Sequence, residues 1–329
     1  MGEKKVQGRS GVGGRIVKEY KTELAMLLIF VVFFALMSFA SPYFFTRQNI
    51  MNVMSQVSST SMLAIGMTIV IITAGIDLSV GANLGLSGMI GCMVMMNTQN
   101  LFLGIAVILI ISVLVGAANG FFVGYLEMPA FIVTLGMMQI CRSLDYVISN
   151  ANTASKFPEA YSFLGKGKIA GQLPVYILFI FIMFGIFIWV MSRTKFGRFL
   201  YAIGSNAEAS RLSGINVKFN TMMAYVISGL MCGLAAWVMT SRLMACDPTY
   251  GDGNEMDAIA AAVIGGTSMS GGRGTLWGTI IGVFLVGFLR NALNILGINP
   301  YWQGSAIGAV IIIAVLAEKV SKLKIKTSK

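Results

Sequence analysis

Long apolar runs without charged residues restrict the fold of this sequence more than any other feature. A helix that crosses a membrane needs about 20 mainly apolar residues. Hydrophobic residues make up 56% of the 329 residues and charged residues only 11%, against roughly 25% charged in soluble domains. We therefore predict an all-α, polytopic membrane protein with about ten transmembrane helices. The predicted spans are 24–44, 50–74, 79–96, 101–125, 130–149, 174–192, 219–241, 256–269, 275–296 and 301–317.

The basic residues predict how these spans are oriented. Sixteen of the 24 Lys and Arg residues lie in three segments, 1–23, 193–218 and 318–329. Cytoplasmic segments carry an excess of Lys and Arg, so we expect a basic N-terminal segment, a loop and a basic tail on the cytoplasmic side of one transmembrane domain, 24–317. Six spans before the loop and four after it satisfy this arrangement. The sequence has no basic stripe interleaved with aromatic residues, which argues against nucleic-acid binding.

This topology places two sets of four spans in opposite directions across the membrane. The set formed by spans 2–5 begins on the outer side of the membrane, and the set formed by spans 7–10 begins on the inner side. Opposed sets are typical of transporters built from inverted-topology repeats. We therefore expect such a repeat, although the two halves show no clear sequence identity.

Two glycine-rich stretches interrupt the apolar runs. The first, 73–88, contains Asp77, the only charged residue between Arg47 and Glu127. Asp77 is interpreted either as an N-cap of the next helix at the cytoplasmic surface, which we favour, or as part of a broken helix that lines a pathway. The second stretch, 262–278, has no Lys-Ser/Thr after its glycines and so is no phosphate-binding loop. Close helix packing through small residues is the favoured interpretation there.

Several polar residues lie within or beside the predicted spans. Arg142 and Asp145 are three residues apart and share a helix face, so we expect a mutual ion pair near the outer end of the span. The alternative is a polar lining for a hydroxyl-rich solute, which would also include Asn83, Asn119, Thr134, Gln139, Asn291 and Asn294. Such residues also hold membrane helices together, and the sequence leaves both interpretations open.

The sequence contains no pattern that predicts an enzyme. It has no histidine, no serine nucleophile elbow and no convincing pair of carboxylates. Its four cysteines show no metal-binding or redox spacing. We therefore expect neither catalysis nor a cofactor.

The polar segment 193–218 has the signals of an ordered surface helix. Ser205 or Asn206 is a suitable cap for a helix that begins near Ala207, with Glu208 in its first turn. Gly214 is a suitable residue to end it. A solvated loop has no need of these signals, so we expect a surface on which a soluble partner docks.

Four motifs in this order resemble the ribose and galactose permease family of ATP-binding-cassette (ABC) importers. They are GMTIVIITAGIDLSVG (66–81), AIGSNAEASRLSGINV (202–217), MDAIAAAVIGGTSMSGGRGT (256–275) and NPYWQ (299–303). EASRLSG, from Glu208 to Gly214, is similar to the loop of these permeases that contacts the ATPase. The sequence has Ser210 where that loop usually has a second Ala, and Ala74-Gly75 where the family often has Gly-Gly.

The resemblance implies a permease subunit that imports a ribose- or galactose-like monosaccharide, or a polyol, through the cytoplasmic membrane of a bacterium. It implies a homo- or heterodimer of permease chains, a separate cytoplasmic ATPase and an extracytoplasmic sugar-binding protein. Glu208, Ala209, Ser210 and Gly214 would be the coupling positions. The alternative is an ion-coupled secondary transporter of a small polar solute. The few acidic residues within the spans argue against that alternative.

Overall fold

The computed structural model describes residues 21–171, 173–299 and 301–327. Its helices are α2 (Lys21–Ala40), α3 (Arg47–Ile72), α4 (Val80–Thr98), α5 (Leu101–Gly124), α6 (Ala130–Ser149), η1 (Glu159–Ser162), α7 (Phe163–Lys166), α8 (Val175–Arg193), α9 (Lys195–Ser205), α10 (Ala207–Leu212), α11 (Val217–Leu243), α12 (Asn254–Ile264), α13 (Leu276–Ile295) and α14 (Tyr301–Thr327). Four two-residue strands are β1 (Ala154–Ser155), β2 (Lys168–Ile169), β3 (Leu173–Pro174) and β4 (Ala245–Cys246).

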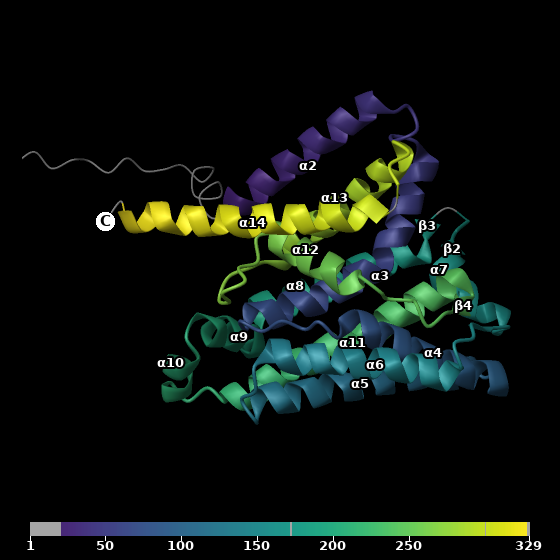
Figure 1. Ribbon diagram of the computed structural model, residues 1–329, viewed down its shortest axis with the longest axis horizontal. Coiled ribbons are helices and arrows are strands. Elements are labelled where there is room, and N and C mark those ends of the chain that lie inside the picture. Colours follow the sequence, from purple (N-terminus) through teal and green to yellow (C-terminus); the bar gives the residue numbers. More distant parts are fainter. Residues whose placement is uncertain (1–20, 172, 300, 328–329) are drawn as a thin grey trace, which may run out of the picture.

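The long helices pack in two groups with α3 between them. On one side, α11 contacts α3, α4 and α5, and α6 packs on α4. On the other side, α12 and α13 contact α3, and α2 and α14 cover them (Figure 1). Buried residues extend along α3 from Val57 to Ile72, so this helix forms the centre of the hydrophobic core.

Glycine allows the helices α5 and α11 to approach closely. A Cβ on Gly116 would overlap the backbone of Gly229 and the carbonyl oxygen of Tyr225, and one on Gly120 would overlap the backbone of Met222. Membrane helices commonly pack through such small residues, because close backbone approach increases their van der Waals contact.

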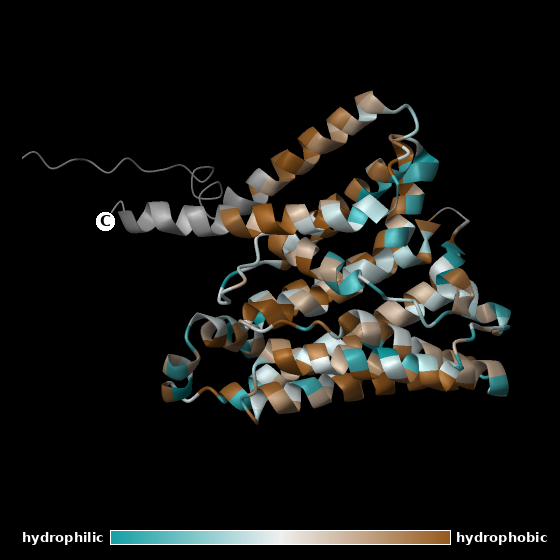
Figure 2. Cartoon of the chain, in the orientation of Figure 1, coloured by the Kyte–Doolittle hydropathy of each residue, from teal (hydrophilic) through white to brown (hydrophobic). Residues whose placement is uncertain are grey.

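Among the described residues, seven helices are long and apolar enough to cross a membrane: α3, α4, α5, α6, α8, α11 and α13. The segments Met26–Ala40 and Tyr301–Leu316 are shorter apolar helices. The chain is therefore an all-helical, polytopic membrane protein, as predicted. Many apolar side chains point away from the core, including Leu114, Ile132 and Trp189, and much of the helical surface in Figure 2 is hydrophobic.

The prediction that 256–269 forms a complete transmembrane helix is wrong. The 11 residues of α12 extend roughly 16 Å at 1.5 Å per residue, about half of the roughly 30 Å hydrocarbon thickness. The helix ends at Ile264 because glycines follow, and Gly266, Gly271 and Gly272 all adopt positive φ. The segment 265–275 continues without helix to α13.

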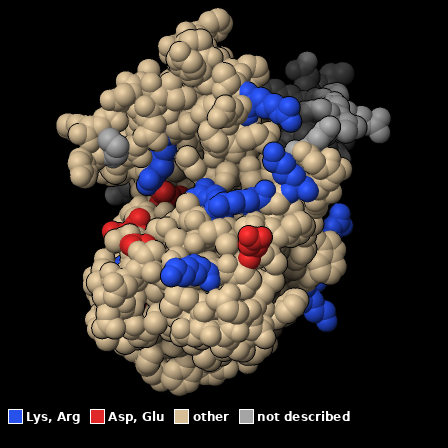
Figure 3. Space-filling view, turned by 90° about the vertical axis from the view of Figure 1, so that its right-hand side faces the viewer, with Lys and Arg blue, Asp and Glu red and all other residues tan. Residues whose placement is uncertain are grey.

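The two ends of the helical bundle differ in structure. Helices α9 and α10 and the C-terminal end of α14 lie at one end, on the left of Figure 1. The strands lie at the other, where β1 pairs with β4 and β2 pairs with β3, both antiparallel. Seen from that second end in Figure 3, acidic side chains lie beside basic ones on the surface. Helix α14 continues to Thr327, so the segment 318–327 prolongs this helix. Residues 1–20 of the predicted N-terminal segment lie outside the described residues.

Candidate functional site

The predicted surface helix in 193–218 is confirmed. Helix α10 begins after Asn206, whose side-chain oxygen accepts a 2.9 Å hydrogen bond from the Ala209 amide. Glu208 lies in its first turn, and Gly214 follows the helix with φ of 82°. The local signals in the sequence are therefore sufficient to define this helix.

A second helix in this segment, α9, is not predicted from the sequence. The Thr194 hydroxyl caps it by accepting a bond of 3.2 Å from the Gly197 amide. Leu200 and Ile203 on α9 are buried, and together with Phe196 they have the spacing of an amphipathic helix. This periodicity is the signal by which α9 could be predicted.

The predicted coupling residues form an exposed surface beside a groove. Arg211 donates hydrogen bonds of 2.9 and 2.6 Å to the two carboxylate oxygens of Glu208, and these bonds lower the pKa of Glu208. Ala209 is exposed, whereas Ser210 is buried and donates 2.8 Å to the Asn206 carbonyl. Leu212 is 75% exposed. The adjacent groove has a volume of about 620 Å³ and extends to Glu127 and Lys218.

Helix α9 joins the two glycine-rich stretches in one contact, which we call the glycine junction: Ile72–Gly75, Gly204–Ser205 and Gly271–Gly274. The Gly272 amide donates 2.9 Å to the Ile72 carbonyl. The Tyr201 hydroxyl donates 2.8 Å to the Gly274 carbonyl. A Cβ on Gly204 would overlap the Ile72 carbonyl oxygen and the Gly272 amide nitrogen. The three backbone segments are therefore in direct contact, consistent with the predicted close packing of 262–278.

Asp77 lies in the protein interior, so its predicted position as a cap at the surface is wrong. Asp77 is only 2% exposed. It accepts hydrogen bonds from the Ser79 amide (3.1 Å), the Ser79 hydroxyl (2.6 Å) and the Ser228 hydroxyl (2.9 Å). These bonds hold the non-helical segment between α3 and α4 against α11.

Most of the polar residues predicted to line a path are not brought together. Asn83 and Asn119 are buried and donate to the Ser112 carbonyl and the Ser79 hydroxyl. Thr134 donates to the Ala130 and Ile76 carbonyls, and Gln139 is exposed. Asn291 exchanges bonds of 2.8 and 2.9 Å with Asn49, and Asn294 accepts 2.6 Å from Gln303. Apart from Gln139, these side chains connect helices and turns, which supports the interpretation as packing contacts.

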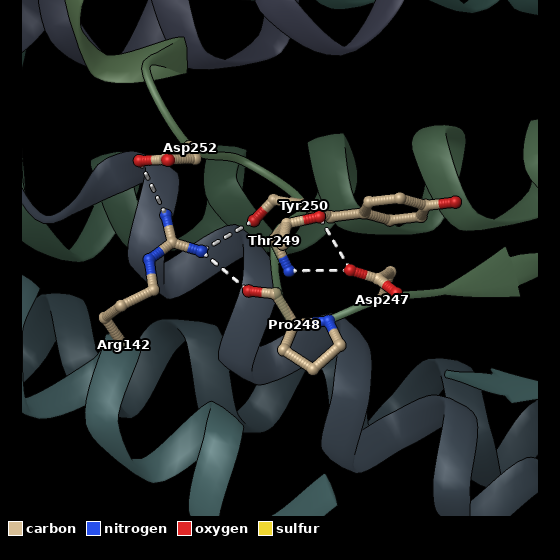
Figure 4. A network of polar contacts seen from close by, with 6 residues as sticks. All are labelled: Arg142, Asp247, Pro248, Thr249, Tyr250 and Asp252. Carbon is tan, nitrogen blue, oxygen red and sulfur yellow. Dashed lines mark hydrogen bonds and ion pairs between the residues drawn. The ribbon is translucent and has the colours of Figure 1, made fainter. Parts of the chain in front are cut away.

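The predicted ion pair of Arg142 with Asp145 is wrong. Arg142 donates 2.9 Å to the Pro248 carbonyl and 3.0 Å to the Tyr250 carbonyl, and lies 3.7 Å from the Asp252 carboxylate (Figure 4). Asp145 is fully buried, and neither carboxylate oxygen has a hydrogen-bond partner. The guanidinium instead holds the 247–253 loop, because that loop offers two carbonyls and a carboxylate on the same side.

Sequence reasoning missed a polar cavity of about 140 Å³ between α3, α11, α12 and α13. Three charged side chains border it, Arg242, Asp257 and Arg290. Arg290 donates 2.7 Å to the Asp257 carboxylate, and Arg242 donates 2.6 Å to the Ser55 carbonyl. Charged residues in an apolar helix are functional candidates by default, and Asp257 and Arg290 lie inside two predicted spans. The presence of these two charged residues within predicted spans was the sequence signal that could have indicated this site.

Comparison with known proteins identifies the family. Residues 49–315 match a family model described as "Branched-chain amino acid transport system / permease component". The chain is 39% identical to the ribose import permease protein of Haemophilus influenzae over 309 residues, covering 93% of this chain and 94% of the relative. It is 37% identical to the D-allose transport system permease protein of Escherichia coli, covering 92% and 91% of the two chains. No solved structure matches.

A third relative has a name of the same kind. The galactose/methyl galactoside import permease protein of Escherichia coli is 33% identical over 314 residues, covering 90% of this chain and 94% of the relative. The matches cover nearly all of the chain and include α3 to α13. The protein therefore belongs to this family of permease components of ABC importers, whose members have no ATPase domain of their own.

Proposed function

We propose that this chain is the permease subunit of an ATP-driven importer that moves a monosaccharide into the cytoplasm of a bacterium. The observation that carries the proposal is the near full-length similarity to permeases named for ribose, D-allose and galactose. The family description names branched-chain amino acids, which provides the second candidate substrate. Family membership also argues against an ion-coupled secondary transporter, because ABC importers use ATP hydrolysis by a partner.

The proposed partners bind at the two ends of the bundle. A cytoplasmic ATPase docks on α10, where Glu208, Ala209 and Leu212 are exposed beside the groove of about 620 Å³. Ser210 and Gly214 support this surface by fixing the helix and the turn after it. An extracytoplasmic sugar-binding protein delivers the solute at the opposite end. A second permease chain, identical or homologous, completes the transmembrane pathway.

The glycine junction supports a route for force from the ATPase to the membrane helices. A displacement of α10 moves α9, which directly precedes it in the chain. Gly204 on α9 contacts both Ile72 and Gly272. Because close-packed backbones cannot be compressed, a shift of α9 moves the ends of α3 and the segment before α13 together. We propose that this movement alternates outward and inward access.

The proposed topology retains cytoplasmic N- and C-termini and ten passes. Helix α12 and the non-helical segment 265–275 together provide one pass. The spans in α3–α6 and α11–α14 form the two opposed halves of an inverted repeat. Both halves then contain a helix that ends at a glycine-rich, non-helical segment, Thr73–Ser79 in one and 265–275 in the other. The protein lies in the cytoplasmic membrane with segments 1–23, 193–218 and 318–329 on its inner side.

Uptake by the complete importer tests this proposal. The chain is expressed with its cognate ATPase and binding protein in a bacterial strain that lacks monosaccharide importers. Radiolabelled D-ribose, D-allose, D-galactose and L-leucine are supplied separately. We expect ATP-dependent uptake of at least one sugar and none of L-leucine. Uptake of L-leucine alone, or sugar uptake that persists without the ATPase, would contradict the proposal.

A charge reversal on α10 tests the docking surface. We expect Glu208→Lys to abolish uptake and to reduce the amount of ATPase that co-purifies with the chain, while membrane insertion is retained. Glu159→Lys, an equal change in the exposed η1, is the matched control for ATPase docking and should leave the co-purification of the ATPase unchanged. Full uptake by Glu208→Lys would rule out the coupling role.

A further inference from the structure

The polar cavity between α3, α11, α12 and α13 has donors that the protein leaves without acceptors. The Nε atoms of Arg242 and Arg290 are both buried and have no hydrogen-bond partner. Buried donors in native proteins are almost always paired, and an unpaired donor costs about 1–3 kcal/mol. Each guanidinium has five N–H donors, and both Arg242 and Arg290 border the same cavity, so an acceptor bound there can receive donors that these side chains leave unused.

The other charged group bordering the cavity is an acceptor. Asp257, whose side chain is 5% exposed, receives 2.7 Å from Arg290. A carboxylate has several acceptor positions, so this bond leaves others for a ligand. Thr60 and Asn254 add a hydroxyl and an amide. The cavity therefore presents fixed donors, fixed acceptors and groups that can act as either, which suits hydroxyl groups because a hydroxyl both donates and accepts.

The cavity wall also has an apolar part, besides two further polar residues, Gln56 and Ser59. Val57, Met239, Val283 and Val286 border it. The C–H face of a sugar ring packs on such side chains while its hydroxyls point to the polar wall. The volume of about 140 Å³ is below the roughly 300–1,000 Å³ of sites for drug-sized ligands, so the cavity suits one small solute. Its position near the start of α12 and the end of α11 places it at the end of the bundle that carries β4.

We propose that this cavity is the binding site for one neutral monosaccharide during transport, and this inference rests on the proposed function. Arg290 and Asp257 bind adjacent hydroxyls as a donor and an acceptor, and the Arg242 guanidinium binds a third oxygen. The short helix α12 holds Asp257 in place. The segment 265–275 that follows connects α12 to the glycine junction. A shift at the junction then moves one wall of the site relative to α3.

Uptake by variants of the complete importer tests the site. We expect Asp257→Asn to lower the initial rate of D-ribose, D-allose or D-galactose uptake about tenfold or more, because hydrogen bonds to charged groups are worth about 1.5–3 kcal/mol. Thr60→Val removes a hydroxyl without changing the shape of the side chain. It should alter the ratio of uptake rates among the three sugars by several-fold. Thr98→Val, at the exposed end of α4, is the matched control and should change neither rate nor ratio.

Co-purification of the ATPase shows whether each variant assembles. If Asp257→Asn does not assemble, Thr60→Val decides, since a structural role would not change the ratio among sugars. Wild-type rates and ratios in both cavity variants would overturn the site while leaving the proposed function intact. Stronger competition by the sugar acid D-gluconate than by unlabelled D-ribose would overturn the assignment to a neutral sugar. No uptake of any sugar by the wild-type importer would overturn the proposed function and this site with it.

Discussion

The amide of Gly272 donates a 2.9 Å hydrogen bond to the carbonyl of Ile72, although 200 positions of the chain separate these two residues. Gly204 packs against both groups. The end of α3, the end of α9 and the segment before α13 thus meet through backbone atoms.

Gly204→Ala tests the glycine junction. Alanine favours a helix over glycine by about 1 kcal/mol, so any loss of activity arises from overlap of the new Cβ with Ile72 and Gly272. We expect uptake to fall about tenfold or more while the chain still co-purifies with its ATPase. Gly185→Ala on α8, where a Cβ would meet nothing within 4 Å, should transport normally. Normal uptake by Gly204→Ala would show that transport does not depend on the close contact of α9 with Ile72 and Gly272.

Asp77→Ala tests the buried carboxylate. The substitution leaves the Ser79 amide, the Ser79 hydroxyl and the Ser228 hydroxyl without their acceptor. Each unpaired buried group costs about 1–3 kcal/mol, so we expect a destabilisation of about 2–5 kcal/mol in thermal unfolding of the purified chain in detergent. Asp252→Ala, which removes an acid that is 81% exposed, should change stability by less than about 1 kcal/mol. An equal effect of the two changes would contradict the role of Asp77.

Arg142→Gln tests the contact shown in Figure 4. Loss of the bonds to the Pro248 and Tyr250 carbonyls should loosen the 247–253 loop. We expect hydrogen exchange of the loop amides to become about tenfold faster, with little change in α9 and α10. Arg193→Gln at the opposite end of the bundle should leave the loop unaffected. Unchanged exchange in Arg142→Gln would show that other contacts hold the loop.

The pH dependence of stability tests Asp247. Hydrogen bonds from Thr249 and Thr153 lower the pKa of Asp247 below its usual 3.8. A carboxyl group whose pKa is lower in the folded state stabilises the fold above its unfolded pKa, and this contribution disappears as pH falls through the folded pKa. The wild-type Tm should therefore exceed that of Asp247→Asn at about pH 6, and the two should converge below about pH 3. A difference that is constant with pH would contradict this assignment.

The membrane helices could be predicted because their signal is local. Long apolar runs define α5, α8 and α11, and the cap at Asn206 with the glycine at 214 defines α10. The end of α12 was missed because Ala258 to Ile264 continues the apolar pattern expected of a full span. Hydropathy does not register that the glycines at 265 and 266 end the helix.

The contacts between distant residues could not be predicted in the same way. Arg142 pairs with Asp252 instead of Asp145, three positions away, because the fold brings a loop with several acceptors to its guanidinium. Asp77 is buried because Ser228, 151 residues later, supplies a donor. The cavity bordered by Arg242, Asp257 and Arg290 depends on the packing of four helices, and no motif in the sequence groups its residues.

The glycine junction also bears on how importers of this kind diversify. Its contacts are made mainly by backbone atoms, so it restricts the size of a few side chains more than their chemistry. In the proposed mechanism, mutations elsewhere can alter which solute is accepted without disturbing the coupling to the ATPase. Substrate specificity can then change through mutations in the binding site while the coupling mechanism stays the same.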